Sequence, residues 1–447
     1  MNTAFVDFAK PVSTIRPLHG VNSGPKTYSF YHDTSASFRE AGIPFSRLHD
    51  TEYPYGSGHF VDIPCIFKNW DADENDPASY DFLFTDMYIQ AILDVGTKVF
   101  YRLGVSIEHA PIKRNIYPPK DFHKWARICE HIIRHYNEGW ANGHEWNIQY
   151  WEIWNEPDGL KNMWLGTPEQ YYELYSVTAN HLKKCFGDSI KVGGFASTGF
   201  AGCAAANISE RSKFLLKYAE DFMKYITAEE TKAPLDFFSW HLYTGSVYVM
   251  TACCRYARAL MARYGFEKAE SVLDEWNYAY MNEERFTRMR TEVGAALASG
   301  CLIEMQHNGV DIGCYYDSQP SMCYCGIFSL ETTKPTKAFY SLKAWNELYK
   351  LGTEVEASSA SSDIRICAAK NENEAGILVS CYEGTEKLVR ICASGLGFDS
   401  GVKATVYAID KDHFYEVIEE STYRDGIVVF QHSCDEYTTF YIKLEKA

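Results

Sequence analysis

Short apolar runs alternate with longer amphipathic segments through most of this chain, and that alternation limits the fold more than any other feature. Apolar runs of this length are typical of buried strands, and the segments between them have the apolar spacing of helices. Strands are predicted at residues 18–22, 45–49, 99–103, 149–155, 191–196, 237–243, 271–276 and 311–316. Helices are predicted at residues 81–95, 122–136, 168–186, 209–226, 252–264, 287–307 and 335–349. Eight strands that alternate with helices favour an α/β fold, the (β/α)8 or TIM barrel.

An open doubly wound sheet is the main alternative for such a pattern, and it usually carries a glycine-rich phosphate loop after its first strand. In this chain the loop after the first predicted strand reads Gly-Val-Asn-Ser-Gly over residues 20–24, without GxGxxG spacing. The sequence therefore favours a barrel, which we assign to residues 17–350.

The remaining residues, 351–447, show short alternating runs separated by turn-forming pairs such as Glu383-Gly384 and Ser394-Gly395. Strands are predicted there at residues 364–368, 375–380, 388–392, 405–409, 427–431 and 438–444, and the serine-rich residues 358–362 are predicted to form a loop. This pattern indicates a C-terminal antiparallel β-sandwich domain. Residues 1–16 are expected to contribute an N-terminal strand to it.

The net charge argues against two classes of partner. The chain has 59 acidic and 43 basic side chains, which gives a formal charge of −16. Such a surface repels nucleic acids and anionic membranes, and no apolar run approaches the roughly 18 residues of a membrane span. Aromatic residues make up 15% of the chain, which suits both a large core and a cleft that stacks on sugar rings. A carbohydrate is the expected partner, and a homo-oligomer is left open.

The N-terminal residues and the cysteines bear on location and cofactors. No basic segment precedes an apolar stretch at the N-terminus, so a secretory signal is not expected and a cytoplasmic location is predicted. The chain has 14 cysteines but no CxxC pair. In a reducing compartment these are free thiols, and their spacing favours neither a zinc ribbon nor another metal site. We expect no metal and no cofactor.

Two carboxylates stand where predicted strands end, which is the catalytic face of a barrel. Glu156 precedes Pro157, and Pro157 cannot continue a central strand. Because side chains alternate along a strand, Glu152, Trp154 and Glu156 are expected to share a face, with Glu152 about 13 Å deeper, towards the barrel floor.

The second carboxylate is Glu275, near the end of the seventh predicted strand. Its neighbour Asp274 competes for the same role, and alternation predicts that only one of the two faces the barrel mouth. Two carboxylates across one mouth suit glycoside hydrolysis, because one can protonate the leaving oxygen while the other attacks the sugar. A separation of about 5 Å would give retention of configuration.

The run Trp151-Glu-Ile-Trp-Asn-Glu-Pro-Asp158 resembles the acid/base strand of clan A glycoside hydrolases, most closely family 39, which includes β-xylosidases and α-L-iduronidases. The resemblance covers the barrel and implies a barrel followed by a β-sandwich. It implies that Glu156 is the general acid/base and Glu275 the nucleophile of a retaining double displacement.

Other strand ends support the same resemblance. His241-Leu-Tyr243 is similar to the His-x-Tyr after strand six of the clan, where the tyrosine contacts the nucleophile and the histidine the acid/base or the sugar. Residues 45–50 resemble strand two, whose arginine (Arg47) supports the nucleophile and whose histidine (His49) reaches the sugar. Asn155 corresponds to the residue that binds the sugar 2-hydroxyl. The substrate-binding residues expected from these matches and from their neighbours are Arg47, His49, Asp50, Asn155, His241, Tyr243, Trp276 and Tyr316.

Two departures leave the sugar open. Asp274-Glu275-Trp276-Asn277 resembles the nucleophile strand of family 51 α-L-arabinofuranosidases, and Tyr315-Tyr316-Asp317 stands where the clan often has a tryptophan. An exo-acting, β-xylosidase-like enzyme on short oligosaccharides is the favoured interpretation. An α-L-arabinofuranosidase, an endo-acting glycosidase and a non-catalytic carbohydrate-binding barrel are the alternatives.

Overall fold

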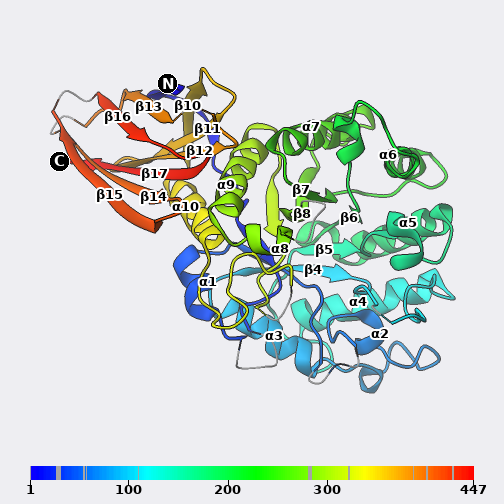
Figure 1. The fold of residues 1–447 in the computed structure, drawn as a ribbon. Helices are drawn as coiled ribbons and strands as arrows, with labels where there is room; N and C mark the ends of the chain where they lie inside the picture. Colours follow the sequence, from blue (N-terminus) through cyan, green and yellow to red (C-terminus); the bar gives the residue numbers. More distant parts are fainter. Residues whose placement is uncertain are drawn as a thin grey trace.

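The computed structural model describes residues 2–26, 32–53, 56, 58–108, 110–279, 284–320, 323–385, 387–398, 401–424 and 427–447. Figure 1 shows a barrel surrounded by helices and, against one side of it, a domain built of strands. Both parts of the predicted fold class are confirmed.

Eight parallel strands close the barrel in sequence order, and the first strand pairs with the last. Each of them overlaps a predicted strand. They are β2 (Gly20–Asn22), β3 (Phe45–Arg47), β4 (Lys98–Leu103), β5 (Tyr150–Ile153), β6 (Lys191–Ser197), β7 (Phe237–Thr244), β8 (Glu270–Tyr278) and β9 (Ile312–Tyr315).

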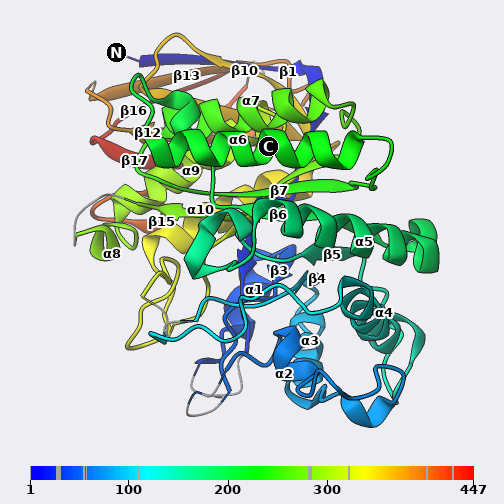
Figure 2. The same ribbon diagram turned by 90° about the vertical axis from the view of Figure 1, so that its right-hand side faces the viewer.

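Helices cover the outside of the barrel, and Figure 2 shows α4 to α7 side by side on that outer surface. The α-helices are α1 (Ser35–Ala41), α2 (Ile63–Ile66), α3 (Leu83–Leu93), α4 (Phe122–Glu138), α5 (Pro168–Phe186), α6 (Glu210–Thr227), α7 (Val247–Arg263), α8 (Arg285–Arg288), α9 (Glu292–His307) and α10 (Lys337–Leu351). Short 3-10 helices lie at η2 (Pro77–Ser79), η3 (Pro157–Asn162), η4 (Gly187–Ser189) and η5 (Ala201–Ala204).

Local signals explain where several helices begin. At α5, Thr167 and Gln170 form a reciprocal capping box, and Pro168 occupies the first helical position. The helix predicted at residues 287–307 begins later, at Glu292, because the Thr291 side chain accepts a hydrogen bond from the backbone of Val293 and caps a separate helix. The short helix α1 was not predicted, because its seven residues are too few to show a helical period.

An apolar plug fills the barrel at the end where its strands begin. Phe45, Phe100, Tyr150 and Phe237 pack together there with Val272, Ile312 and Cys314, and all seven are buried. Since these residues stand at or near the starts of their strands, the plug closes the floor, and the polar strand ends gather at the opposite face.

The second domain is a nine-stranded, mostly antiparallel sheet in the described part of the chain, with the order β15-β14-β17-β12-β11-β10-β1-β13-β16. Side chains from β1, β12, β13, β16 and β17 meet in one core, as in a sandwich. The strands are β1 (Asn2–Thr14), β10 (Thr353–Ser359), β11 (Ile364–Lys370), β12 (Glu374–Tyr382), β13 (Leu388–Ser394), β14 (Val402–Ile409), β15 (Phe414–Tyr423), β16 (Val428–Ser433) and β17 (Tyr437–Lys446).

The N-terminal strand lies inside this domain, antiparallel to β10 and parallel to β13. Its partner β10 includes Ser358 and Ser359, so the loop predicted at residues 358–362 is wrong at its first two positions. Pairing with Phe5 and Ala4 satisfies the backbone of these serines, which their polar side chains do not reveal. Strand β15 was also missed, because many of its side chains are polar and exposed.

Helix α9 joins the two domains, as Figure 1 shows. Ser380 Oγ of β12 donates to the carbonyl of Ala296 (2.7 Å), and Thr439 Oγ1 of β17 lies 3.1 Å from Ser299 Oγ. Because the barrel covers one side of α9 and the sheet the other, the helix is apolar or small on nearly all sides and almost entirely buried. None of the described helices is long and apolar enough to cross a membrane.

The two phenylalanines of β1 provide a test of this architecture. Phe8 is fully buried, whereas Phe5 is 52% exposed. Phe8→Ala should lower the free energy of unfolding by about 3–5 kcal/mol because it empties part of the sandwich core. Phe5→Ala, the control in the same strand, should lower it by less than about 0.5 kcal/mol. Urea unfolding followed by fluorescence measures both, and equal losses would contradict the assigned register.

Candidate active site

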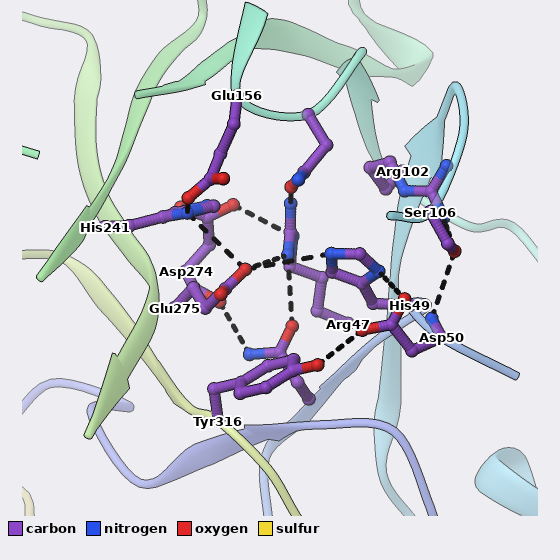
Figure 3. A network of polar contacts seen from close by, with 12 residues as sticks. Arg47, His49, Asp50, Arg102, Ser106, Glu156, His241, Asp274, Glu275 and Tyr316 are labelled. Carbon is purple, nitrogen blue, oxygen red and sulfur yellow. Dashed lines mark hydrogen bonds and ion pairs between the residues drawn. The ribbon is translucent and has the colours of Figure 1, made fainter. Parts of the chain in front are cut away.

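The guanidinium of Arg47, at the end of β3, is the centre of a buried polar network above the apolar plug (Figure 3). Its Nε and Nη2 donate to Glu152 Oε2 at 2.9 and 2.7 Å. Nη2 also donates to Asn155 Oδ1 at 2.6 Å, and Nη1 donates to Asn22 Oδ1 at 3.1 Å. Arg47 therefore ties together the ends of β2 and β3 and the C-terminal part of β5.

Two carboxylates of β8 face the same guanidinium. Asp274 Oδ2 lies 2.9 Å from Arg47 Nε, and Glu275 Oε2 lies 3.3 Å from Arg47 Nη1. The prediction that only one of them faces the barrel mouth is therefore wrong. In the pairing of β7 with β8, Trp240 lies opposite Leu273 and the next residue, His241, lies opposite Glu275. Asp274 has no partner in β7 and is the extra residue of a β-bulge. A bulge interrupts the alternation of side chains and allows two neighbours to point to the same side.

The alternation also fails at the end of β5. Trp154 has φ 74° and Glu156 has φ 47°, both in the left-handed region, so the extended strand ends at Ile153. The indole of Trp154 packs near Trp125 of α4, outside the barrel, and donates to the carbonyl of Met163. The prediction that Trp154 shares a face with Glu152 and Glu156 is thus wrong. Glu152 faces Arg47 below the mouth.

Glu156 and Glu275 lie on either side of His241 (Figure 3). His241 Nδ1 is 2.8 Å from Glu156 Oε1 and 3.4 Å from Glu275 Oε2. One oxygen of each carboxylate and one nitrogen of His241 all lie within 4.8 Å of one another. These three groups are therefore close enough to exchange protons with one another.

The donors around Glu275 come from β7 and from the end of β3 with the residues just after it. Tyr243 of β7 donates its hydroxyl hydrogen to Oε1 at 2.5 Å. Oε2 faces Arg47, His241 and, at 3.7 Å, His49 Nε2. Burial, and then the charge of Glu275, holds the pKa of Tyr243 well above its usual value, so this hydroxyl keeps its proton and acts as a donor.

The wall beside Glu275 is formed by residues that follow β3 and β9. His49 Nδ1 is 3.2 Å from Asp50 Oδ1, and the Tyr316 hydroxyl donates to the other carboxylate oxygen. Although burial opposes it, the charge of His49 and the bond from Tyr316 lower the pKa of Asp50 below its usual value. Tyr316 also packs edge-on against His49. The structure thus joins three predicted sugar-binding residues to one another.

The protonation of the network follows from burial and from the neighbouring charges. Burial alone would lower the pKa of His241, but Glu275 and Asp274 raise it well above its ordinary value, so the ring is cationic. Burial raises the pKa of Glu152 to about 8, against the attraction of Arg47. Arg47 and His241 lower the pKa of Asp274 despite its burial. The cations Arg47 and His241 therefore face ionised Asp274 beside a neutral Glu152 at neutral pH.

Trp276 is the predicted site residue that the structure does not bring to the two carboxylates. Its indole is buried and packs edge-on against Tyr315 at 5.1 Å between ring centroids. The bulge at Asp274 turns Glu275 inward, and Trp276, the next residue, points the other way. The remaining predicted residues are Arg47, His49, Asp50, Asn155, Glu156, His241, Tyr243, Glu275 and Tyr316, and contacts connect them around one centre.

Three residues of the site were not predicted as functional, namely Asn22, Glu152 and Tyr324, and Asp274 was considered only as a competitor of Glu275. Asn22 ends the first barrel strand, and the strand-end argument applied there would have found it. The ring of Tyr324 lies 5.8 Å from Tyr243 and 5.9 Å from Tyr316, but it comes from the loop after β9, where no periodicity marks it. Glu152 and Asp274 required the three-dimensional contacts of Arg47.

Comparisons with known proteins show which sequences and folds this chain resembles. A sequence model of Glycosyl hydrolases family 39 matches residues 35–286, more than half of the chain. The chain is 25% identical over 352 residues to a β-xylosidase of Caldicellulosiruptor saccharolyticus, an alignment that covers 71% of this chain and 66% of that protein. It is 27% identical over 201 residues to a β-xylosidase of Geobacillus stearothermophilus, covering 43% of this chain and 36% of that protein. The matched part is thus just under two thirds of the first relative and about a third of the second.

Solved structures share the whole fold. A glucosidase from Croceicoccus marinus superposes with a TM-score of 0.79 at 21% identity, and the match covers 100% of this chain and 99% of that one. A monomeric β-xylosidase from Caulobacter crescentus CB15 gives 0.73 at 16% identity, with 100% and 99% covered. At these identities the likeness shows a common fold of barrel and β-domain.

Glu152 should make stability depend on pH. Its pKa is raised from 4.5 to about 8 in the folded chain, so between these values the folded state holds a proton that the unfolded state has released. Stability should therefore fall as the pH rises through this window. Glu152→Gln keeps the hydrogen-bond acceptor but cannot ionise. From pH 5 to 8, the wild type should lose about 1 kcal/mol or more relative to this variant.

Urea unfolding at several pH values measures the difference, and Glu372→Gln, at an exposed turn, is the control. The control should follow the wild type at every pH. Parallel pH profiles for wild type and Glu152→Gln would contradict the assigned protonation.

Proposed function

The chain belongs to Glycosyl hydrolases family 39, and from this premise we propose that it is a retaining glycoside hydrolase in which Glu156 is the general acid/base and Glu275 the nucleophile. The observation that carries the proposal is that an oxygen of each carboxylate lies within 4.8 Å of the other, with His241 beside both. Retaining enzymes separate their two carboxyl groups by roughly 5–5.5 Å, whereas inverting enzymes leave more room for a water molecule.

In the first step, Glu275 attacks the anomeric carbon while Glu156 donates its proton to the glycosidic oxygen. The carbon–oxygen bond to the leaving group breaks, and an ester forms between the sugar and Glu275. In the second step, Glu156 takes a proton from water, and the resulting nucleophile attacks the same carbon and releases Glu275. Two inversions give net retention.

The surroundings of Glu275 suit both steps. Tyr243 donates to one oxygen, while Arg47, His241 and His49 face the other. These donors hold the carboxylate in position for attack and stabilise the charge that returns to it when the ester breaks. Because they are already in place before the substrate binds, little reorganisation is needed during the reaction.

We further propose that the substrate is a neutral β-D-xyloside at the end of a short oligosaccharide. The names of both curated relatives support a xyloside. The −16 charge of the chain disfavours an anionic sugar. His49, Asp50 and Tyr316 are buried and bonded to one another, so the wall that they form has little freedom to retreat from a bulkier sugar.

Azide rescue tests the two roles. On an aryl β-xyloside, Glu156→Ala and Glu275→Ala should each lower kcat by about 100-fold or more. Azide should restore turnover to both variants. It should give a β-azide with Glu156→Ala, since it attacks the glycosyl-enzyme, and an α-azide with Glu275→Ala, since it replaces the nucleophile. Product configuration is determined by proton NMR.

Glu372→Ala, at an exposed turn, is the matched control and should keep wild-type activity. Azide products of the same configuration from both active-site variants would overturn the assignment. Sugar binding without turnover on any aryl glycoside would favour a carbohydrate-binding barrel instead.

A substrate panel tests the sugar. The kcat/KM for an aryl β-D-xylopyranoside should exceed those for the β-D-glucopyranoside and the α-L-arabinofuranoside by at least about 10-fold, the discrimination that one badly fitted group provides. With xylotetraose as the substrate, early release of xylose and xylotriose in equal amounts would support exo action. Preference for the arabinofuranoside, or early release of xylobiose, would redirect the proposal to the corresponding alternative.

A further inference from the structure

Asp86, His135 and His144 come together outside the barrel, in a cluster that the proposed reaction does not use. Asp86 lies in the first turn of α3, His135 in the last turn of α4, and His144 in the loop that follows α4. His135 Nε2 is 3.0 Å from Asp86 Oδ1, and His144 Nε2 is 3.5 Å from Asp86 Oδ2. One ligand atom from each residue lies within 4.8 Å of the other two.

The contacts of His135 require a positive charge at this point. Its Nδ1 is 2.9 Å from the carbonyl oxygen of Trp140, and its Nε2 faces the carboxylate of Asp86. Both partners only accept hydrogen bonds, yet a neutral imidazole has a single N–H to donate. With the hydrogen on Nδ1, the lone pair of Nε2 points at the carboxylate. Either a second proton or a metal ion must then lie between them.

A hydrogen on Nδ1, which the carbonyl of Trp140 favours, gives the tautomer that metal-binding histidines use. Such a histidine donates one ring N–H to a backbone carbonyl or a carboxylate, which fixes the ring and leaves the other nitrogen free for the metal. His135 is only 2% exposed and stacks on Phe82 at 3.6 Å between centroids, so its ring has no freedom to turn away.

His144 favours a metal over a second proton. A proton satisfies one nitrogen–oxygen contact, but here a second histidine nitrogen faces the other oxygen of the same carboxylate. The ring of His144 stacks on Trp146 at 3.7 Å. Its backbone N–H donates to the carbonyl of His135 at 2.6 Å, and its carbonyl accepts from Gly139 at 2.9 Å. Both ring and backbone are therefore held facing the carboxylate.

Gly143 shows how closely this loop fits around His135. A Cβ at position 143 would lie 2.1 Å from the His135 carbonyl oxygen and 2.6 Å from its Nδ1. Any larger residue would therefore push the loop, and His144 with it, away from the cluster.

We propose that Asp86, His135 and His144 bind a divalent transition-metal ion of the zinc class. Two imidazole nitrogens and one carboxylate suit such an ion, with tetrahedral ligands about 3.3 Å apart. His144 is 31% and Asp86 26% exposed, so solvent reaches the site and can complete the coordination. The ion would link α3, α4 and the following loop, which assigns it a structural role.

A second cluster on α4 and α5 provides a matched control. Glu130, His181 and Cys185 also bring three ligand atoms within 4.8 Å. There, however, Arg134 Nε lies 2.8 Å from Glu130 Oε1 and already neutralises that carboxylate. Electrostatics therefore disfavour an ion at Glu130, whereas no Lys or Arg among the described residues is within ion-pair distance of Asp86.

Zinc titration of the metal-stripped full-length chain tests the proposal. Calorimetry compares the wild type with His144→Ala, Asp86→Asn and His181→Ala. Each variant lacks one candidate ligand and keeps all the others. The wild type and His181→Ala should bind zinc with the same affinity. His144→Ala and Asp86→Asn should bind it at least about 100-fold more weakly. Zinc should raise Tm in the first two proteins, with little effect in the other two.

Thermal unfolding without zinc checks that each variant is folded. Equal zinc binding by the wild type and a folded His144→Ala would overturn the proposal. So would a wild type that takes up no zinc, because the cluster would then be an ion pair made by a doubly protonated His135. Both outcomes are independent of glycosidase activity.

Discussion

A buried guanidinium organises the catalytic face of this barrel. Arg47 is surrounded by protein, so its charge must be met by carboxylates and amide oxygens from other strands. Glu152, Asp274 and Glu275 supply the carboxylates, and Asn22 and Asn155 the amide oxygens. Removing one partner of a buried ion pair typically costs about 3–5 kcal/mol because it leaves the other charge uncompensated. The need to neutralise the charge of Arg47 therefore constrains the positions of four strands or strand ends. One of these contacts holds Glu275 in place.

Irregular backbone produces the geometry that regular strands would not. The bulge at Asp274 turns two consecutive carboxylates to one side, and left-handed residues at Trp154 and Glu156 end β5. Non-glycine residues in that region cost energy, commonly about 1 kcal/mol or more. Here the strained backbone turns Asn155 and Glu156 towards the mouth of the barrel, while Trp154 is buried on the other side. The apolar plug below and the packed helices outside supply the stability that offsets it.

The β-domain supports the barrel from the side. Its inner face closes a separate core, while its other face packs on α9 and α10, so α9 is buried between two domains. The N-terminal strand completes this sheet before the chain enters the barrel, so both ends of the barrel sequence are anchored to the same sheet. If the proposed zinc ion binds, it would link α3 to α4 on the opposite side of the barrel, through Asp86 and His135.

Local pattern was sufficient for much of this protein. Periodicity, helix caps and a proline predict the eight barrel strands, most of the helices and the positions of Glu156 and Glu275 near strand ends. They can do so because each of these signals acts over a few residues.

Which side chains contact one another was decided only by the tertiary structure. A register shift at Asp274 and positive φ at Trp154 depend on the neighbouring strands, so alternation failed there. Asp86, His135 and His144 come from separate segments. The pKa of Glu152 is raised by burial and by the charge of Asp274, against the attraction of Arg47. Contacts and desolvation of this kind exist only after the chain has folded.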